Sequence, residues 1–107
     1  FDDAPNGIVG LETCVGLMLT HVVGEGLIDL PTLVERMSLA PARAFHLPGG
    51  TLAQDSAADV TIIDPDAEWT VRAGAFLSLS RNTPFEGWNL RGRPVATIVG
   101  GRTVWTL

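Results

Sequence analysis

The residues most capable of chemistry in this sequence are two histidines, His21 and His46, and a single cysteine, Cys14. Neither histidine stands in a His-x-His pair, an HExxH motif or a Cys/His cluster, the spacings that bring metal-binding side chains together. Cys14 lies in an apolar stripe at helical spacing, where we expect a small buried hydrophobic residue rather than a reactive thiol. The sequence therefore predicts no catalytic residue and no metal ligand in this chain of 107 residues.

Carboxylate pairs occur at Asp2-Asp3 and at Asp64 and Asp66. Adjacent residues on a loop point apart, so we expect Asp2 and Asp3 to be solvated. Asp64 and Asp66 stand in the segment DPDAEW, whose Asp and Pro residues are typical of a turn. Asp59 precedes a predicted strand, and we expect it to hydrogen-bond loop backbone. The sequence contains no Ser/His/Asp order, phosphate loop or dinucleotide-binding glycine motif.

The composition excludes several classes of function. The net charge is −5, and the seven basic residues are scattered arginines, so no basic patch is dense enough for a nucleic-acid partner. No apolar run reaches the ~20 residues that span a bilayer, so no membrane partner is expected. One cysteine cannot form an internal disulfide, which fits a reducing compartment and predicts a cytoplasmic protein. A hydrophobic content of 46% excludes a disordered tail.

The elements that must position these residues begin with a predicted helix in GIVGLETCVGLMLTHVV, residues 7–23. Its apolar residues form one stripe at helical spacing: Leu11, Cys14, Val15, Met18, Leu19 and Val22. A second helix is predicted after Asp29, a candidate N-cap, with Pro31 in its first turn. Its expected buried face is Leu30, Leu33, Val34 and Met37. A third helix should follow Pro41 and end at Pro48-Gly49-Gly50.

From Thr51 the sequence becomes typical of β-structure. Val60–Ile63 predicts a strand, and a separate short strand is predicted around Glu68–Val71, followed by a helical or irregular piece at Ala73–Ser80. Near the end, two alternating segments flank Gly100-Gly101, a two-residue turn that hairpins favour. The apolar first helix needs a larger surface to pack against, and the chain begins abruptly at Phe1. We therefore expect the C-terminal end of a longer protein.

Three segments together resemble the C-terminal portion of a dihydroorotase of the longer bacterial type, in the amidohydrolase superfamily. GIVGLETCVGLMLT, residues 7–20, is similar to the Gly-Leu-Glu-Thr segment that opens the last barrel helix. SLAPARAFHLPGGTLAQDSAADVTIIDP, residues 38–65, resembles the superfamily's Pro-Ala-Arg helix and the Ala-Asp strand after it. SRNTPFEGWNLRGRPVATIVGGRTVW, residues 80–105, resembles the closing segment. Hydantoinases and allantoinases share parts of these patterns, whereas Gly10–Thr13 and Gly87-Trp88 favour dihydroorotase.

The resemblance implies the fold class α/β. This chain would supply the last loop and helices of a (β/α)₈ metal-dependent hydrolase barrel, residues 1–48, and the C-terminal half of a small β-sandwich, residues 49–107. The implied reaction is the reversible hydrolysis of the cyclic amide of dihydroorotate to N-carbamoyl-L-aspartate in de novo pyrimidine biosynthesis. The implied cofactor is zinc, whose ligands would all precede Phe1. The chain alone is therefore expected to be inactive.

The segment FDDAPNGIVG, residues 1–10, predicts a shaped loop. Asn6 and Gly7 accept positive φ, which brings backbone close to whatever the loop faces. On the residues alone, an ordinary turn into the first helix also explains them. The resemblance places this loop at the barrel mouth, so Asn6 and Gly7 are the predicted substrate-binding residues, although the family often has Phe where Asn6 stands. Asp55 stands where the family usually has a turn glycine, which Asp can replace.

Other interpretations stay open. A non-catalytic dihydroorotase-like protein would serve as a structural partner of aspartate transcarbamoylase, and a hydantoinase or allantoinase would act on a different cyclic amide. An autonomous interaction domain would leave the apolar stripe exposed. The expected partners are the small-molecule substrate, the N-terminal part of the same protein, and either a second copy or aspartate transcarbamoylase.

Overall fold

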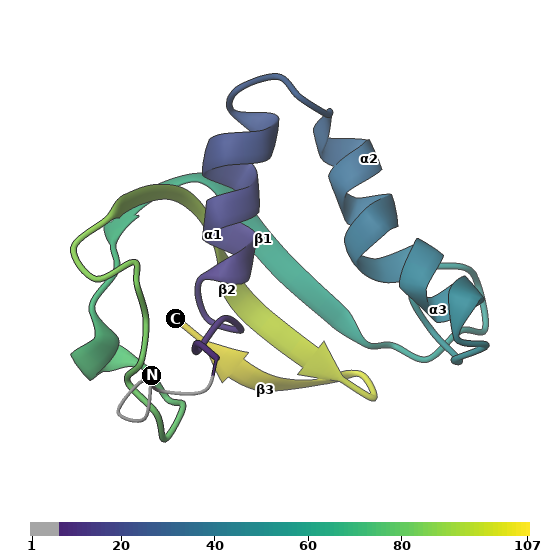
Figure 1. The fold of residues 1–107 in the computed structure, drawn as a ribbon. Helices are drawn as coiled ribbons and strands as arrows, with labels where there is room; N and C mark the ends of the chain where they lie inside the picture. The colour runs from purple at the N-terminus through teal and green to yellow at the C-terminus, as the bar shows by residue number, and fades with distance from the viewer. Residues whose placement is uncertain (1–6) are drawn as a thin grey trace.

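A computed structural model of the protein describes residues 7–107. The predictions for Asp2, Asp3 and Asn6 lie outside the described residues. The elements in chain order are α1 (Cys14–Met18), η1 (Leu19–Val23), α2 (Leu30–Val34), η2 (Glu35–Leu39), α3 (Ala40–Ala44), β1 (Val60–Thr70), η3 (Ala73–Ala75), β2 (Asn89–Val99) and β3 (Arg102–Thr106). Figure 1 shows two helical runs followed by a three-stranded sheet, so the chain is a small α/β unit.

The first helical run confirms the predicted helix, but only part of the face predicted to be buried is buried. α1 begins after Gly10, whose carbonyl accepts the N–H groups of Thr13 and Cys14, and it continues without a break into the wider turn η1. The buried residues of this part of the chain are Thr13, Gly16 and Leu19, and the last two lie against the strands. Leu19, a member of the expected stripe, is buried, whereas Leu11 and Cys14 at the start of the stripe are exposed, Leu11 by 91%. Gly16, which has no side chain, lets the helix approach the strands closely.

The second helical run begins as the sequence predicts. The Asp29 carboxylate accepts the N–H of Thr32 at 2.9 Å, and Pro31 occupies the first turn. α3 confirms the third helix predicted at Pro41, but it follows α2 and η2 directly instead of beginning after a break. A proline inside a helix removes one backbone donor, and the wide turn η2 just before it is the kind of local adjustment that accommodates this loss. Within residues 7–107, Leu33 is the buried member of the face predicted for this helix.

β1 and β2 form an antiparallel pair that is interrupted by a bulge. Asp64 pairs with Arg93 and Glu68 with Arg91, so three residues of β1 face one residue of β2, Gly92. The predicted turn at Asp64 and Asp66 is this bulge, and the two predicted strands are one continuous strand. The Asp64 carboxylate accepts the N–H groups of Asp66 and of Ala67, which satisfies the backbone where the ladder is broken.

The predicted hairpin is confirmed. β2 and β3 pair antiparallel up to Val99 and Arg102, with Gly100 and Gly101 between them at φ values of 54° and 76°. Two consecutive positive φ angles match the twist of the flanking strands. Asp59 accepts the Gly100 N–H at 2.7 Å, which confirms the backbone-binding role expected for it.

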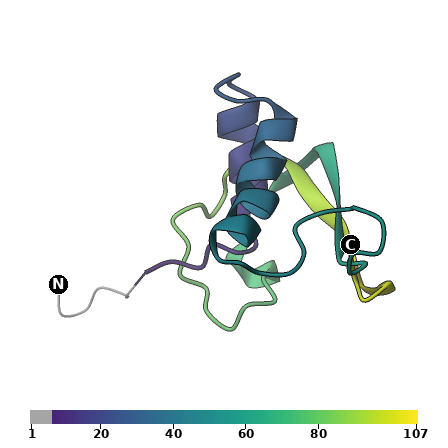
Figure 2. The same ribbon diagram turned by 90° about the vertical axis from the view of Figure 1, so that its right-hand side faces the viewer.

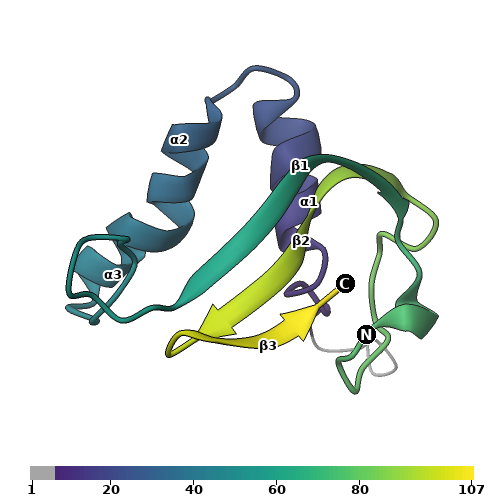
Figure 3. The same cartoon turned by 180° about the vertical axis from the view of Figure 1, so that it is seen from behind.

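In Figure 1 α1 lies in front of the strands, and in Figure 3, seen from behind, the strands lie in front of α1, so α1 covers one face of the sheet. Figure 2 shows α2 and α3 on the same side as α1. The sheet order is β1-β2-β3. A small core lies where α1, the end of β1 and the start of β2 meet, built on Val71, Phe76 and Leu90. No helix within residues 7–107 is long and apolar enough to cross a membrane.

Candidate functional site

Gly7 is the one predicted substrate-binding residue that the structure describes, since Asn6 lies outside the described residues. Gly7 is exposed and has a φ of 74°. A Cβ placed on it would meet no described atom within 4 Å, so the space beside this backbone is open. The positive φ is therefore the constraint at this position, and it favours glycine.

Asn82 holds the chain on both sides of Ile8. Its side-chain N–H group (Nδ2) donates to the Gly7 carbonyl, and its own backbone carbonyl accepts the Val9 N–H at 2.8 Å. The first of these hydrogen bonds joins residues 75 positions apart in the sequence. As a result, the loop at Gly7 is fixed by the segment that follows the sheet's first strand rather than by its own turn alone.

Glu12 adds a second tie between the same two segments. Its carboxylate accepts the N–H of Leu77 at 2.9 Å, the N–H of Ser78 at 3.0 Å and the hydroxyl of Ser78 at 2.6 Å. Partial burial raises the pKa of Glu12, but the hydrogen bonds from Ser78 and Leu77 and the nearby Arg81 charge outweigh it and leave the pKa below its ordinary value. Glu12 is therefore an ionised acceptor at neutral pH.

Arg81 stiffens the segment that makes these ties. Its guanidinium donates to the carbonyl of Ser78 and, at 3.0 Å, to the carbonyl of Ser80. The segment 77–82, which we call the brace, is thus held by its own hydrogen bonds and by Glu12 and Gly7 of the first loop. Together the brace and the loop fix the backbone at Gly7.

The histidines and the cysteine do not gather into one site. His21 is half-exposed, with Nδ1 3.3 Å from the Glu25 carboxylate and its ring edge-on to Trp88. His46 is exposed with a φ of 54°, and Asp55, at the expected turn position, has a φ of 65°. Within residues 7–107, no three His, Cys, Asp or Glu side chains lie close enough to hold a metal ion.

Asp66, the second member of the predicted carboxylate pair, forms an ion pair with Arg91 across the bulge. Both side chains are largely exposed, so this pair contributes little to stability. The Asp64 carboxylate accepts hydrogen bonds from two backbone N–H groups of the same bulge. The two carboxylates therefore have structural partners and do not act together as an acid and a base.

Sequence reasoning missed the brace. Glu12 stands out in the sequence only as part of a motif, and the roles of Ser78 and Asn82 were not predicted. Their partners lie 65 to 75 residues away in the sequence. No local spacing connects such residues, so a single sequence offered no signal that could have paired them.

The chain is similar to known enzymes along almost its whole length, although no family model matches it. A dihydroorotase of Halalkalibacterium halodurans is 51% identical over 95% of this chain, and a dihydroorotase of an Anaeromyxobacter species is 53% identical over 97%. The chain spans about a quarter of the length of these curated relatives, 24% in both cases.

Solved structures agree with this likeness. The L-hydantoinase (dihydropyrimidinase) of Arthrobacter aurescens matches 97% of this chain with a TM-score of 0.88 and 41% sequence identity. The D-hydantoinase (dihydropyrimidinase) of a Thermus species matches 99% with a TM-score of 0.88 and 30% identity. The chain covers 24% of each of these structures. At these identities the likeness extends beyond the fold to the sequence itself.

Proposed function

We propose that this chain is the C-terminal portion of a dihydroorotase and that the whole protein hydrolyses the cyclic amide of dihydroorotate reversibly to N-carbamoyl-L-aspartate, a step of de novo pyrimidine biosynthesis. One observation carries the proposal. Dihydroorotases match the chain at 51% and 53% identity, whereas the two hydantoinase structures match it at 41% and 30%. The identity thus favours dihydroorotate over a hydantoin as the substrate. The proposal includes a cytoplasmic location for the whole protein, because the substrate and the product of this step are soluble metabolites.

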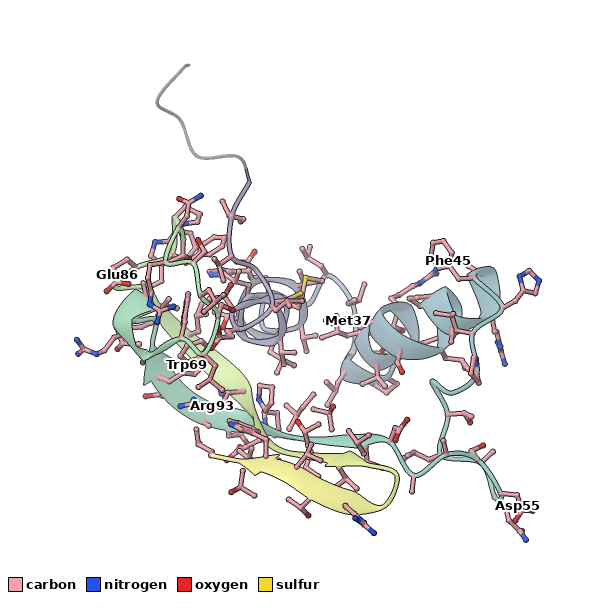
Figure 4. All side chains as sticks on the ribbon, turned by 90° about the horizontal axis from the view of Figure 1, so that it is seen from below. Met37, Phe45, Asp55, Trp69, Glu86 and Arg93 are labelled. Carbon is pink, nitrogen blue, oxygen red and sulfur yellow. The ribbon has the colours of Figure 1, made fainter. Side chains whose placement is uncertain are left out.

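The exposed apolar side chains support the proposal that the chain is part of a larger fold. Leu11, Leu27 and Val34, which lie on or beside the helical runs, are 91%, 69% and 52% exposed. Phe45, at the end of α3, is 74% exposed and projects away from the strands in Figure 4. Such surfaces are covered in stable proteins. We assign residues 1–48 to the last loop and helices of a (β/α)₈ barrel and residues 49–107 to half of a small β-sandwich.

Zinc belongs to the proposed enzyme, but residues 7–107 offer no site for it. The described residues do not fit the ion, because they bring no three ligands of the required kind together. His21 already lies against Glu25 and Trp88, and His46 stands alone at a turn. The proposal places the metal and its ligands in the part of the protein that would precede this chain.

Gly7 is the residue of this chain that we assign to substrate binding, together with Asn6. A backbone N–H without a neighbouring side chain can approach a carbonyl or carboxylate oxygen of a small cyclic amide closely. The open space beside Gly7 and the positive φ support this role. In a (β/α)₈ enzyme the loops at the carboxyl ends of the strands form the site, which is where the resemblance places this loop.

The test uses the full-length protein. Purified protein is incubated with dihydroorotate, with N-carbamoyl-L-aspartate or with hydantoin, and substrate and product are separated by chromatography. Interconversion of the first two compounds, at a kcat/KM well above that for hydantoin, is the expected result. Faster turnover of hydantoin than of dihydroorotate would show that the protein is a hydantoinase, the second candidate. The 41% identity to the Arthrobacter aurescens L-hydantoinase structure is the observation that favours this candidate. Absence of turnover with a correctly folded, zinc-loaded protein would favour the non-catalytic partner of aspartate transcarbamoylase.

Oligomeric state and partners are part of the same proposal. A second copy of the protein and aspartate transcarbamoylase are the two candidate partners. Size-exclusion chromatography with light scattering, alone and with purified aspartate transcarbamoylase, distinguishes a monomer, a homodimer and a mixed complex.

A further inference from the structure

The loop that carries Gly7 is attached to the brace at two separate points. Asn82 binds the Gly7 carbonyl and the Val9 N–H, and Glu12 binds the backbone and side chain of the brace at Leu77 and Ser78. Between these two points lie only Gly10 and Leu11. The path of the loop is therefore set by contacts that come from the part of the chain assigned to the sandwich.

Asn82 is the residue of the brace nearest to the candidate contact. The Gly7 carbonyl that it binds belongs to the same residue whose N–H is assigned to the substrate. The direction of that N–H depends on the φ and ψ angles of Gly7, and a glycine has more freedom in these angles than any other residue. The Asn82 side chain holds the Gly7 carbonyl, and the Asn82 backbone carbonyl holds the Val9 N–H, so the peptide plane and the Cα that follow the Gly7 N–H are fixed in place.

We propose that Asn82 is a positioning residue for substrate binding, which acts by holding the Gly7 backbone in the orientation that receives the substrate. The proposal rests on the proposed function, since it needs Gly7 to contact the substrate. Its consequence is that a residue of the sandwich-forming segment, remote in sequence from the loop, sets the affinity of the barrel site. The donor is the decisive feature, because the Gly7 carbonyl can only accept a hydrogen bond.

A purely structural role for Asn82 makes a different prediction. If Asn82 only holds the two segments together, its loss lowers stability and lowers the amount of active enzyme, which reduces the apparent kcat and leaves KM unchanged. If Asn82 positions the contact, its loss raises KM, because the loop must be ordered at the moment of binding. The division of the effect between KM and kcat therefore separates the two roles.

The experiment compares Asn82→Ala and Asn82→Asp with Asn89→Ala in the full-length protein. Asn82→Asp keeps the shape of the side chain but removes its donor. Asn89→Ala is the matched control: Asn89 accepts the Thr70 hydroxyl at 2.7 Å on the sheet, so this variant also loses one side-chain hydrogen bond, away from the loop. The measurements are KM and kcat for dihydroorotate, the thermal midpoint, and hydrogen exchange of the Val9 amide.

We expect both Asn82 variants to raise KM about tenfold, the loss that one net hydrogen bond corresponds to, with kcat changed less than about twofold. Val9 exchange should accelerate in both variants, and Asn89→Ala should keep the wild-type KM. An unchanged KM in the Asn82 variants, with Val9 exchange accelerated, overturns the proposal while leaving the proposed function intact. A fall in kcat and thermal midpoint without a change in KM also overturns it. Failure of the proposed function is recognised separately, because the wild-type protein itself would then convert no dihydroorotate.

Discussion

The close packing of α1 on the sheet leads to a prediction that runs against helix propensity. Gly16 is buried, and a Cβ built on it would lie 2.8 Å from Cζ2 of Trp69, 3.1 Å from Cδ1 of Leu90 and 3.2 Å from the carbonyl oxygen of Gly92. The shortest of these contacts forces something to move. The Gly92 carbonyl is backbone in the bulge, so it cannot turn away as a flexible side chain would.

Trp69 has little room to yield. Its indole N–H donates to the Gly92 carbonyl at 3.0 Å, and the Arg93 guanidinium lies 5.1 Å from the centre of its ring. Figure 4 shows Trp69 and Arg93 next to each other on the strands. The ring is therefore held from two sides, and moving it would break a hydrogen bond as well as a cation–π contact.

The change in stability is the balance of two opposing effects. Replacing glycine by alanine in a helix normally stabilises it by roughly 0.5–1 kcal/mol. Forcing an extra carbon into a packed core costs about 1–3 kcal/mol. Overpacking outweighs helix propensity at Gly16, so Gly16→Ala should destabilise the protein by about 0.5–2 kcal/mol.

Urea unfolding of the full-length protein, followed by tryptophan fluorescence, measures this difference. Gly74→Ala is the control, since Gly74 stands in the short helix η3 and a Cβ there would meet no described atom within 4 Å. We expect a lower midpoint for Gly16→Ala and an unchanged or slightly higher one for Gly74→Ala. A Gly16→Ala variant as stable as wild type, or more stable, would refute the close approach of α1 to Trp69.

Three further predictions concern the loop and the whole chain. Gly7→Val should lower kcat/KM for dihydroorotate by about tenfold or more. The control is Gly26→Val, since Gly26 has a φ of 73° and equally open surroundings, and this variant should keep the wild-type kcat/KM. Equal losses of kcat/KM in the two variants would show that Gly7 does not contact the substrate. Glu12→Gln should be less stable than wild type at neutral pH, with Glu35→Gln as the control. Because the pKa of Glu12 is lowered in the folded state, its contribution is complete above the ordinary value of 4.5 and is lost as the pH falls through the folded value. A difference that persists in acid would contradict this assignment. Residues 1–107 alone with added zinc should not convert dihydroorotate, and measurable turnover would place a catalytic site within them.

Local signals in the sequence predicted the elements whose geometry depends on a few neighbouring residues. The hairpin at Gly100-Gly101 was predicted because only residues that accept positive φ fit a two-residue turn. The N-cap at Asp29 was predicted for a similar reason, since its carboxylate reaches a backbone N–H three residues ahead. The bulge at Asp64 was mistaken for a turn, because the same hydrogen bonds from nearby N–H groups to an Asp carboxylate occur in both.

Periodicity located the first helix but could not say which of its faces meets the sheet. The predicted stripe included Leu11, Cys14 and Leu19, yet only Leu19 of these three is buried, and it shares the face on the sheet with Gly16. Apolar residues show that a face will be covered, but they do not show what covers it. Small residues on a helix are compatible with turns, with caps and with close packing alike, so Gly16 could be interpreted only once its neighbours on the strands were known. The brace could not be predicted for the same reason: the residues that it contacts are known only from the structure, and they lie 65 to 75 positions away in the sequence.

The two faces of α1 together constrain what kind of protein contains it. One face of the run formed by α1 and η1 is covered by the sheet through Gly16 and Leu19, and the opposite face presents Leu11 and Cys14 to solvent in residues 7–107. A helix that is apolar on both sides is characteristic of one packed between two layers. The sheet is the first of these layers, and the proposed barrel supplies the second. Under this proposal the loop at Gly7 would lie where barrel, helix and brace meet, and contacts from the brace would help to set the geometry of the proposed site.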